Sequence, residues 1–133
     1  MTSIMIRRFE DAFKAIKKQE PGNKIKGLNE YQDEALRSMH LPTKQWIIYS
    51  VLGLNGEAGE VAEKVKKAIR ENNGLLSPYS RREIAKEIGD CLWNCAILAA
   101  SINYTLEEVA NINAEKIKSR EQRGKLHGNG DNR

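Results

Sequence analysis

Two short acidic motifs constrain this chain more than any other feature of its sequence. Glu57-x-x-Glu60 and Glu87-x-x-Asp90 each place two carboxylates three residues apart, with a glycine immediately before the second acid. In an α-helix, residues three apart lie on the same flank, separated by about 60° around the axis. If the chain reverses near Gly74, the two helices run antiparallel and Glu60 comes level with Asp90. The sequence therefore predicts four carboxylates along one edge of a helix hairpin.

Such a cluster of acids needs a compensating charge, because like charges raise each other's pKa and buried charges need partners. A bound cation is the simplest remedy. A ligand set made only of carboxylate oxygens suits Mg²⁺, or Mn²⁺, better than zinc. The alternative is a solvated helix surface, since Glu60 with Lys64 and Glu63 with Lys67 have the i,i+4 spacing of ordinary surface ion pairs. The duplicated spacing and the two glycines favour a metal site.

Apolar residues recur at helical spacing along the chain, and no segment has convincing strand periodicity. The first predicted helix covers residues 3–19, is amphipathic, and ends at Pro21-Gly22. A short second helix opens at Asn29-x-x-Gln32, which resembles a capping arrangement, and closes at Leu41-Pro42. The predicted fold class is all-α.

The third and fourth predicted helices form the hairpin. Thr43 is the expected cap of the third, which stops at Asn72-Asn73-Gly74, and Ser80-x-x-Glu83 is the expected capping box of the fourth. Both helices carry apolar stripes that alternate steps of four and three residues, as long packed helices do. The stripes are Ile47, Val51, Leu54, Ala58, Val61, Val65 and Ala68 on the third helix, and Ile84, Ile88, Cys91, Cys95, Leu98 and Ile102 on the fourth.

The fourth helix is apolar on almost every side between Cys91 and Ile102. A helix that is apolar all round is buried all round. A chain of 133 residues with one such hairpin has too few other helices to cover it. We therefore expect a homo-oligomer, a dimer or a tetramer, that completes the helical core.

A fifth helix is expected after the capping box Thr105-x-x-Glu108. Leu106, Val109, Ala110 and Ile117 form its predicted inward face. Asn113, Lys116 and Arg120 make a polar line about one turn apart. Alternatively, Asn113 is a core residue with satisfied hydrogen bonds, and Lys116 and Arg120 are the solvated edge of the helix. Beside a metal held by acids, however, a basic row is what a polyphosphate requires, because its charge must be neutralised on both sides.

Composition narrows the class of protein. The net charge is +4, but the 22 basic and 18 acidic residues are interspersed, so nucleic-acid binding is not the favoured prediction. Cys91 and Cys95 lie one turn apart and no histidine has ligand-like spacing, which disfavours zinc sites and Cys-His catalysis. No signal peptide or membrane-spanning stretch is evident, so we expect a soluble cytoplasmic protein. The alternative function is a small basic helical nucleic-acid-binding or regulatory protein.

The two acidic motifs, followed by Asn113-x-x-Lys116-x-x-x-Arg120, resemble the MazG-like nucleotide pyrophosphohydrolases of the short single-domain phage and bacterial type. The similarity runs from residue 29 to 133. It implies an all-α bundle completed by a second subunit, and Mg²⁺-dependent hydrolysis of nucleoside or deoxynucleoside triphosphates to monophosphate and pyrophosphate. It also implies roles for individual residues. The metal ligands and catalytic acids would be Glu57, Glu60, Glu87 and Asp90, and the phosphates would be held by Asn113, Lys116 and Arg120.

We accordingly divide the chain into an N-terminal amphipathic helix and linker (1–28), a catalytic helical domain (29–121) and a flexible Gly-rich basic tail (122–133). Relatives that act on phosphoribosyl-ATP or dUTP share the acid layout, so the base and sugar stay open. Trp46, Trp93 and Asn94 are candidates for the lining of the base pocket. Gly56 stands where some relatives have a further Glu, which leaves the number of metal ions open as well.

Overall fold

The computed structural model describes residues 11, 14 and 24–125 of the chain. This part is all-α, as predicted, with no strand among the described residues. It consists of α2 (Leu28–Ser38), the 3-10 helix η1 (Thr43–Gln45), α3 (Trp46–Asn72), α4 (Pro78–Ser101) and α5 (Leu106–Gln122). The predicted helix over residues 3–19 falls outside the described residues except at positions 11 and 14, as does the tail beyond residue 125.

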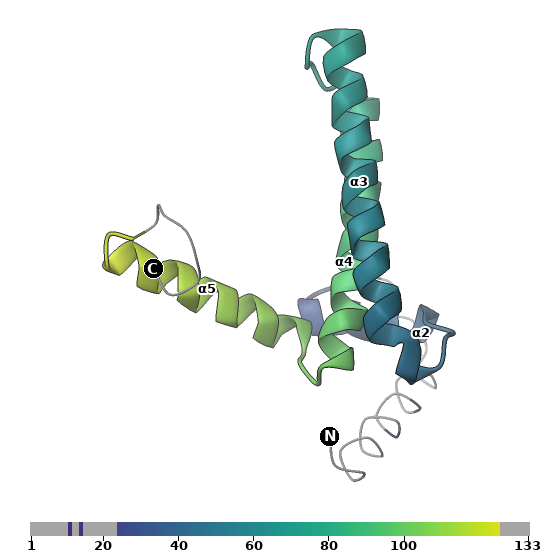
Figure 1. Ribbon diagram of the computed structural model, residues 1–133, viewed down its shortest axis with the longest axis vertical. Helices are drawn as coiled ribbons and strands as arrows, with labels where there is room; N and C mark the ends of the chain where they lie inside the picture. Colours follow the sequence, from purple (N-terminus) through teal and green to yellow (C-terminus); the bar gives the residue numbers. More distant parts are fainter. Residues whose placement is uncertain (1–10, 12–13, 15–23, 126–133) are drawn as a thin grey trace.

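The helices α3 and α4 form a long antiparallel hairpin, with α2 packed at its base and α5 leading away from it (Figure 1). The hairpin turn follows the sequence prediction. Asn73 (φ 49°) and Gly74 (φ 79°) both adopt left-handed backbone conformations. The Gly74 N–H donates to the Ala68 carbonyl at 3.2 Å, which closes the end of α3.

The predicted start of α5 is confirmed, whereas the predicted start of α4 is wrong. The capping box of α5 is confirmed, because Thr105 and Glu108 each accept from the other's backbone N–H. The box predicted at Ser80 is wrong, because α4 begins at Pro78 and its cap is Ser77, whose Oγ accepts from the Ser80 N–H at 3.1 Å. Proline favours the first helical position, where its missing N–H costs nothing, and this sets the start three residues earlier.

Gln32 does not cap α2, contrary to the sequence prediction. The N-cap of α2 is Gly27, without a side-chain hydrogen bond. Gln32 is buried instead, and its amide donates to the carbonyls of Ala96 (3.0 Å) and Tyr104 (3.2 Å) while accepting from the Leu106 N–H (3.0 Å). The first N–H groups of α5 have no partner within their own helix. The buried Gln32 amide satisfies one of them, and this stabilises the fold more than capping α2 would.

Asn29 completes this attachment of α5 to α2. Its side chain donates to the Glu107 carboxylate at 2.7 Å and accepts from the Glu107 N–H at 3.2 Å. Thr43, the expected cap of α3, instead opens η1, and α3 starts at Trp46 without a side-chain cap.

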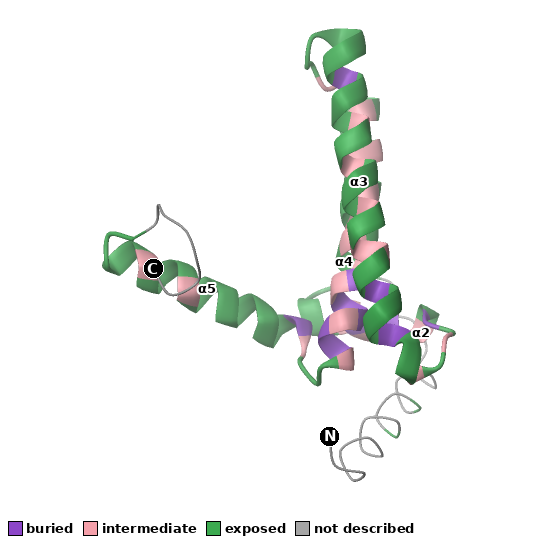
Figure 2. Cartoon of the chain, in the orientation of Figure 1, coloured by how far each residue is buried: buried purple, intermediate pink, exposed green. Residues whose placement is uncertain are grey.

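The hydrophobic core lies at the base of the hairpin, where α2, α4 and the start of α5 meet α3 (Figure 2). Trp46 and Ile97 are completely buried there, and the Trp46 indole donates to the Leu41 carbonyl at 2.8 Å. The buried cluster comprises Ala35, Leu36, Met39, Trp46, Ala96, Ile97, Ala100 and Leu106.

The contact face of α3 is rotated from the predicted stripe by about one residue. Four of the predicted stripe positions, Ile47, Val51, Ala58 and Val65, are exposed. Anchoring of Trp46 in the core turns the helix, so that the polar residues Glu57 and Lys64 enter the interface with α4. The buried or half-buried residues of α3 are Trp46, Ser50, Gly53, Leu54, Glu57, Val61, Lys64 and Ala68.

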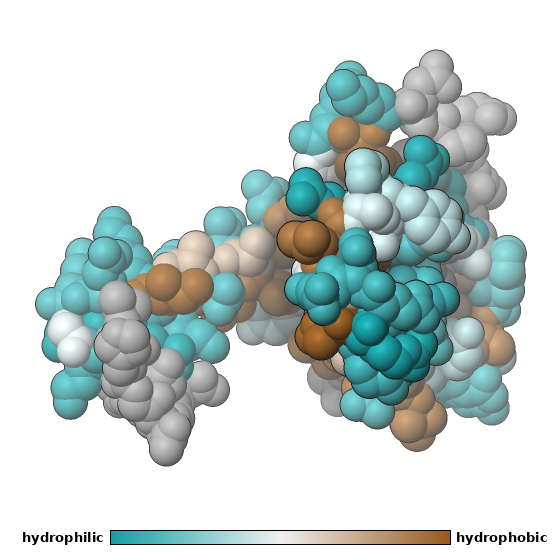
Figure 3. Space-filling view, turned by 90° about the horizontal axis from the view of Figure 1, so that it is seen from above, coloured by the Kyte–Doolittle hydropathy of each residue, from teal (hydrophilic) through white to brown (hydrophobic). Residues whose placement is uncertain are grey.

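Much apolar surface remains uncovered in a single chain. Ile88 and Leu92 on α4 are exposed, as is Ile102 just beyond its end, so the expected burial on every side is not achieved within one chain. Leu106 is buried, but the rest of the predicted inward face of α5, namely Val109, Ala110 and Ile117, is exposed, because α5 departs from the hairpin. In Figure 3, apolar side chains are visible along α5, which projects to the left, as well as on the rest of the molecule.

No helix of the described range has both the length and the apolar character needed to cross a bilayer.

The register of the hairpin is fixed by a close approach between Gly53 and Asn94. A Cβ added to Gly53 would lie 2.3 Å from the Asn94 Oδ1. Asn94 cannot swing aside freely, because it is only 4% exposed and its Nδ2 donates to the Asp90 carbonyl at 2.9 Å. Side chains larger than hydrogen at position 53 must therefore push the two helices apart.

We predict that Gly53→Ala lowers the free energy of unfolding by about 1–3 kcal/mol, the usual cost of overpacking an interface. Gly56→Ala is the matched control on the same helix, since nothing lies within 4 Å of its added Cβ. It should be neutral or stabilise by up to about 1 kcal/mol, because alanine is the better helix former. Urea unfolding followed by circular dichroism measures both. Equal stability of the two variants would show that the approach at Gly53 does not limit the packing.

Candidate active site

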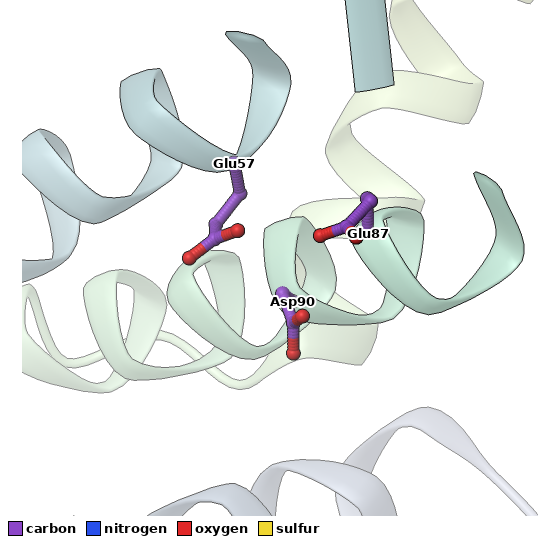
Figure 4. A group of neighbouring side chains, drawn as sticks. All are labelled: Glu57, Glu87 and Asp90. Atoms are coloured by element: carbon purple, nitrogen blue, oxygen red, sulfur yellow. The ribbon is translucent and has the colours of Figure 1, made fainter. Parts of the chain in front are cut away.

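Three carboxylates meet where α3 and α4 face each other. Glu57 projects from α3, while Glu87 and Asp90 lie one turn apart on α4 (Figure 4). One oxygen from each of the three lies within 4.8 Å of the others. Glu57 and Glu87 are half-buried, and Asp90 is exposed. This acid group, Glu57, Glu87 and Asp90, joins two motifs that are 30 residues apart in the sequence.

The fourth predicted acid, Glu60, is not part of this group. It is exposed on α3, one turn beyond Glu57. The expected alignment of Glu60 with Asp90 is wrong, since it is Glu57 that comes close to Asp90. The cause is the rotated contact face of α3, which brings Glu57 towards α4 and leaves Glu60 towards solvent.

Lys64 lies against the acid group from the tip side of the hairpin. Its Nζ is 3.0 Å from the Glu87 Oε1 and 4.0 Å from the Glu83 Oε2. The hydrogen bond to Glu87, helped by the charges of Glu87, Glu83 and Glu60, raises the pKa of Lys64. The surface pair expected between Glu60 and Lys64 is thus replaced by a contact between helices.

The other expected surface pair also differs, because Glu63 pairs with Lys66 rather than with Lys67.

A cavity of about 340 Å³ opens beside the acid group. Two of its walls are aromatic, since the rings of Tyr49 and Trp93 meet edge to face with centroids 6.5 Å apart. The Trp93 indole is held by a 2.7 Å hydrogen bond to the Ser38 hydroxyl. The lining residues are Tyr49, Leu52, Gly53, Glu57, Asp90, Trp93 and Asn94.

Sequence reasoning found part of this cavity. Trp93 and Asn94 line it, but Trp46, the third candidate for the base pocket, does not, because it is fully buried in the core. Tyr49 and Gly53 were missed. Their signal was available, since positions 49, 53 and 57 follow each other at four-residue steps and so share one side of a helix.

Asn94 has a hydrogen-bonding capacity that the protein leaves unused. Because the Asp90 carbonyl can only accept, the group 2.9 Å from it must be the Asn94 NH₂. The atom that remains is the Oδ1, which is buried and has no hydrogen-bond partner. An unsatisfied buried acceptor costs free energy, and native proteins contain few such atoms.

The helix α2 also contacts the acidic motif of α4. The Tyr31 hydroxyl on α2 donates to the Gly89 carbonyl at 3.2 Å. Burial and, next, the negative charge of Asp90 raise the pKa of this phenol. Tyr31 thus remains a neutral donor beside the acidic motif of α4.

The polar line of α5 is not brought to the acid group within one chain. Asn113 is exposed, and Lys116 and Arg120 are half-buried. None of the three lines the cavity, because α5 packs near its start on α2 and α4 and then leads away (Figure 1). Their predicted role in phosphate binding therefore cannot be fulfilled at the acid group of the same chain in this arrangement.

The chemistry of the donor set fits a hard divalent cation. The acid group offers three carboxylate oxygens at short mutual distance, without histidine or cysteine. Oxygen-only sets of this kind are preferred by Mg²⁺ and Mn²⁺. The Lys64 ammonium beside Glu87 shows that the group already attracts positive charge.

Comparisons with known proteins found a relative and a matching domain family. The chain is similar to the Gene 37 protein of Mycobacterium phage L5, with 42% identity over 85 residues, which cover 64% of this chain and 75% of that protein. No solved structure matches the chain. The model of the MazG nucleotide pyrophosphohydrolase domain matches residues 49–124, more than half of the chain, and spans both acidic motifs and the polar line of α5. The chain therefore belongs to the MazG nucleotide pyrophosphohydrolase family.

Proposed function

We propose that this protein hydrolyses nucleoside or deoxynucleoside triphosphates to monophosphate and pyrophosphate with Mg²⁺, or Mn²⁺, as cofactor. The observation that carries the proposal is the acid group, two of whose members, Glu57 and Asp90, line a cavity with two aromatic walls. Membership of the family supports the reaction class. The cavity is of a size that suits a small-molecule site, and the polar residues Glu57, Asp90 and Asn94 are part of its lining.

In this proposal, Glu57, Glu87 and Asp90 hold the divalent cation. When bound, the cation neutralises the phosphate chain and lowers the pKa of an attacking water. Glu60, one turn from Glu57, is proposed as the ligand that joins the set from the solvent side. A carboxylate of the set that is not fully engaged takes the proton of the water.

Tyr49 and Trp93 would stack against the nucleobase, since aromatic side chains stack on the flat face of any base. Asn94 would form part of the wall of the substrate site, with its Oδ1 packed against Gly53 of α3. The roles of Asn113, Lys116 and Arg120 in holding the phosphates are part of the same proposal.

We predict that Glu57→Gln and Asp90→Asn each lower the turnover of the preferred triphosphate by about two orders of magnitude or more, because each removes a charged ligand. Glu63→Gln, an exposed change on α3 outside the acid group, should keep near-normal turnover. The assay is a panel of ribo- and deoxyribonucleoside triphosphates with Mg²⁺, scored for pyrophosphate against orthophosphate.

Circular dichroism should show unchanged helix content in all three variants. Full turnover by either acid-group variant would contradict the proposed site. Salt-dependent DNA binding that a chelator does not affect, with no pyrophosphate from any nucleotide, would favour the alternative of a small nucleic-acid-binding protein.

We also propose that the protein acts as a homo-oligomer, a dimer or a tetramer. Large apolar side chains are exposed along α3, among them Ile47, Ile48, Val51 and Leu52. Contiguous exposed apolar surface of this kind is typical of subunit interfaces. The arrangement of α5 supports the same conclusion, because Lys116 and Arg120 of one copy would need a second copy to approach an acid group.

We predict that the wild-type protein sediments as a dimer or larger at micromolar concentration, and that Ile48→Glu shifts it towards the monomer, because a charge at the centre of an apolar interface is left unpaired. Leu75→Glu is the matched control, since both side chains are 69% exposed but Leu75 lies at the hairpin turn. A wild-type monomer in analytical ultracentrifugation would overturn the oligomer proposal.

A further inference from the structure

Lys64 lies between acidic residues of α4 and an acidic residue of its own helix, α3. From α3 it reaches Glu87 at 3.0 Å and Glu83 at 4.0 Å, both on α4 and one turn apart. Glu60, one turn earlier on its own helix, also acts on it through its charge. The side chain is 30% exposed, so packing within the hairpin restricts it more than an ordinary surface lysine.

The carboxylate of Glu87 is therefore shared. It belongs to the acid group with Glu57 and Asp90, and it also accepts from Lys64. A carboxylate has about four acceptor positions on its two oxygens, so it can serve both partners at once. The acid group has three negative charges, and Lys64 supplies one positive charge at its edge.

We infer that Lys64 is the internal counter-ion of the acid group, which holds Glu87 in place before a divalent cation arrives and competes with that cation for the charge of the group. This inference rests on the proposed role of the acid group in binding a divalent cation. It makes Lys64 a positioning residue, since it acts through Glu87.

Two effects of Lys64 oppose each other. As a hydrogen-bond donor it orients Glu87, which favours cation binding. As a positive charge beside a ligand, it repels the cation, and between charges on a partly exposed surface this repulsion amounts to roughly a threefold to tenfold change in affinity. A substitution that keeps a donor and removes the charge separates the two effects.

Lys64→Gln is that substitution, and Lys64→Arg keeps the charge. Lys66→Gln is the matched control on the same helix, because Lys66 pairs with Glu63 outside the acid group. Binding of Mn²⁺ alone, without nucleotide, is followed by the electron paramagnetic resonance signal of the free ion. Lys64→Gln should bind Mn²⁺ about threefold to tenfold more tightly than the wild type, while the other two variants stay within about twofold of it.

Thermal unfolding gives a second readout that does not depend on catalysis. Without metal, Lys64→Gln should unfold at a lower temperature than Lys66→Gln, because the acid group has lost its counter-ion. Saturating Mn²⁺ should then raise the unfolding temperature of Lys64→Gln more than that of the wild type, as expected for tighter binding to the folded state.

The outcomes separate this inference from the proposed function. If the wild type binds Mn²⁺ and Lys64→Gln binds it equally or more weakly, the counter-ion role is wrong and the proposed metal site stands. If the wild type does not bind Mn²⁺ at all, the proposed cofactor is wrong and the counter-ion inference is overturned with it.

Discussion

The site depends on the register between α3 and α4, because the acids come from two motifs that meet only in one alignment of the hairpin. At the tip, Asn73 and Gly74 reverse the chain in left-handed conformations. Towards the base, the missing side chain of Gly53 lets Asn94 pack against α3. Between these two points the alignment has no freedom to slide by a turn, and it brings Glu57 to the acids of α4.

This alignment has an electrostatic cost that the hairpin offsets locally. Three carboxylates with oxygens within 4.8 Å of one another repel, and half-burial of two of them makes the repulsion stronger. Lys64 lies in the same interface and provides a positive charge against Glu87. The same arrangement that is costly alone is suited to a divalent cation. Stability and function are thus in tension at one short stretch of the interface.

The base of the molecule ties the other helices to this hairpin. Trp46 anchors α3 in the core, and Gln32 joins α2 to the end of α4 and the start of α5 through three hydrogen bonds. Among the described helices, α5 contacts only α2 and α4 extensively. In the proposed oligomer, another copy would cover its apolar residues and bring its basic row to an acid group.

Sequence patterns predicted the local features well where the deciding partner is nearby. The all-α class, the stop at Asn73-Gly74 and the capping box at Thr105 all depend on residues within one turn, and they are confirmed. The pairing of the two acidic motifs also follows from helical spacing plus one reversal. Three of the four acids, Glu57, Glu87 and Asp90, meet in the hairpin, although in a different alignment from the predicted one.

Three of the wrong predictions, those for Gln32, Glu60 and Trp46, share a physical cause, which is a tertiary contact that no local pattern encodes. Gln32 reads as a capping residue, but its partners are 64 to 74 positions away. Burial of Trp46 rotates α3, so the contact face includes Glu57 in place of apolar neighbours, and Glu60 is left outside the acid group. Trp46, predicted as a candidate for the base pocket, belongs to the core, because its partners there come from other helices.

The most direct test of the central claim is a crystal structure of the wild-type protein with Mn²⁺, with the ion located by its anomalous scattering. The predicted result is a peak coordinated by oxygens of Glu57, Glu87 and Asp90 beside the cavity formed by Tyr49 and Trp93. An ion bound elsewhere, with these three carboxylates turned separately towards solvent, would contradict the claim that the hairpin builds a metal site.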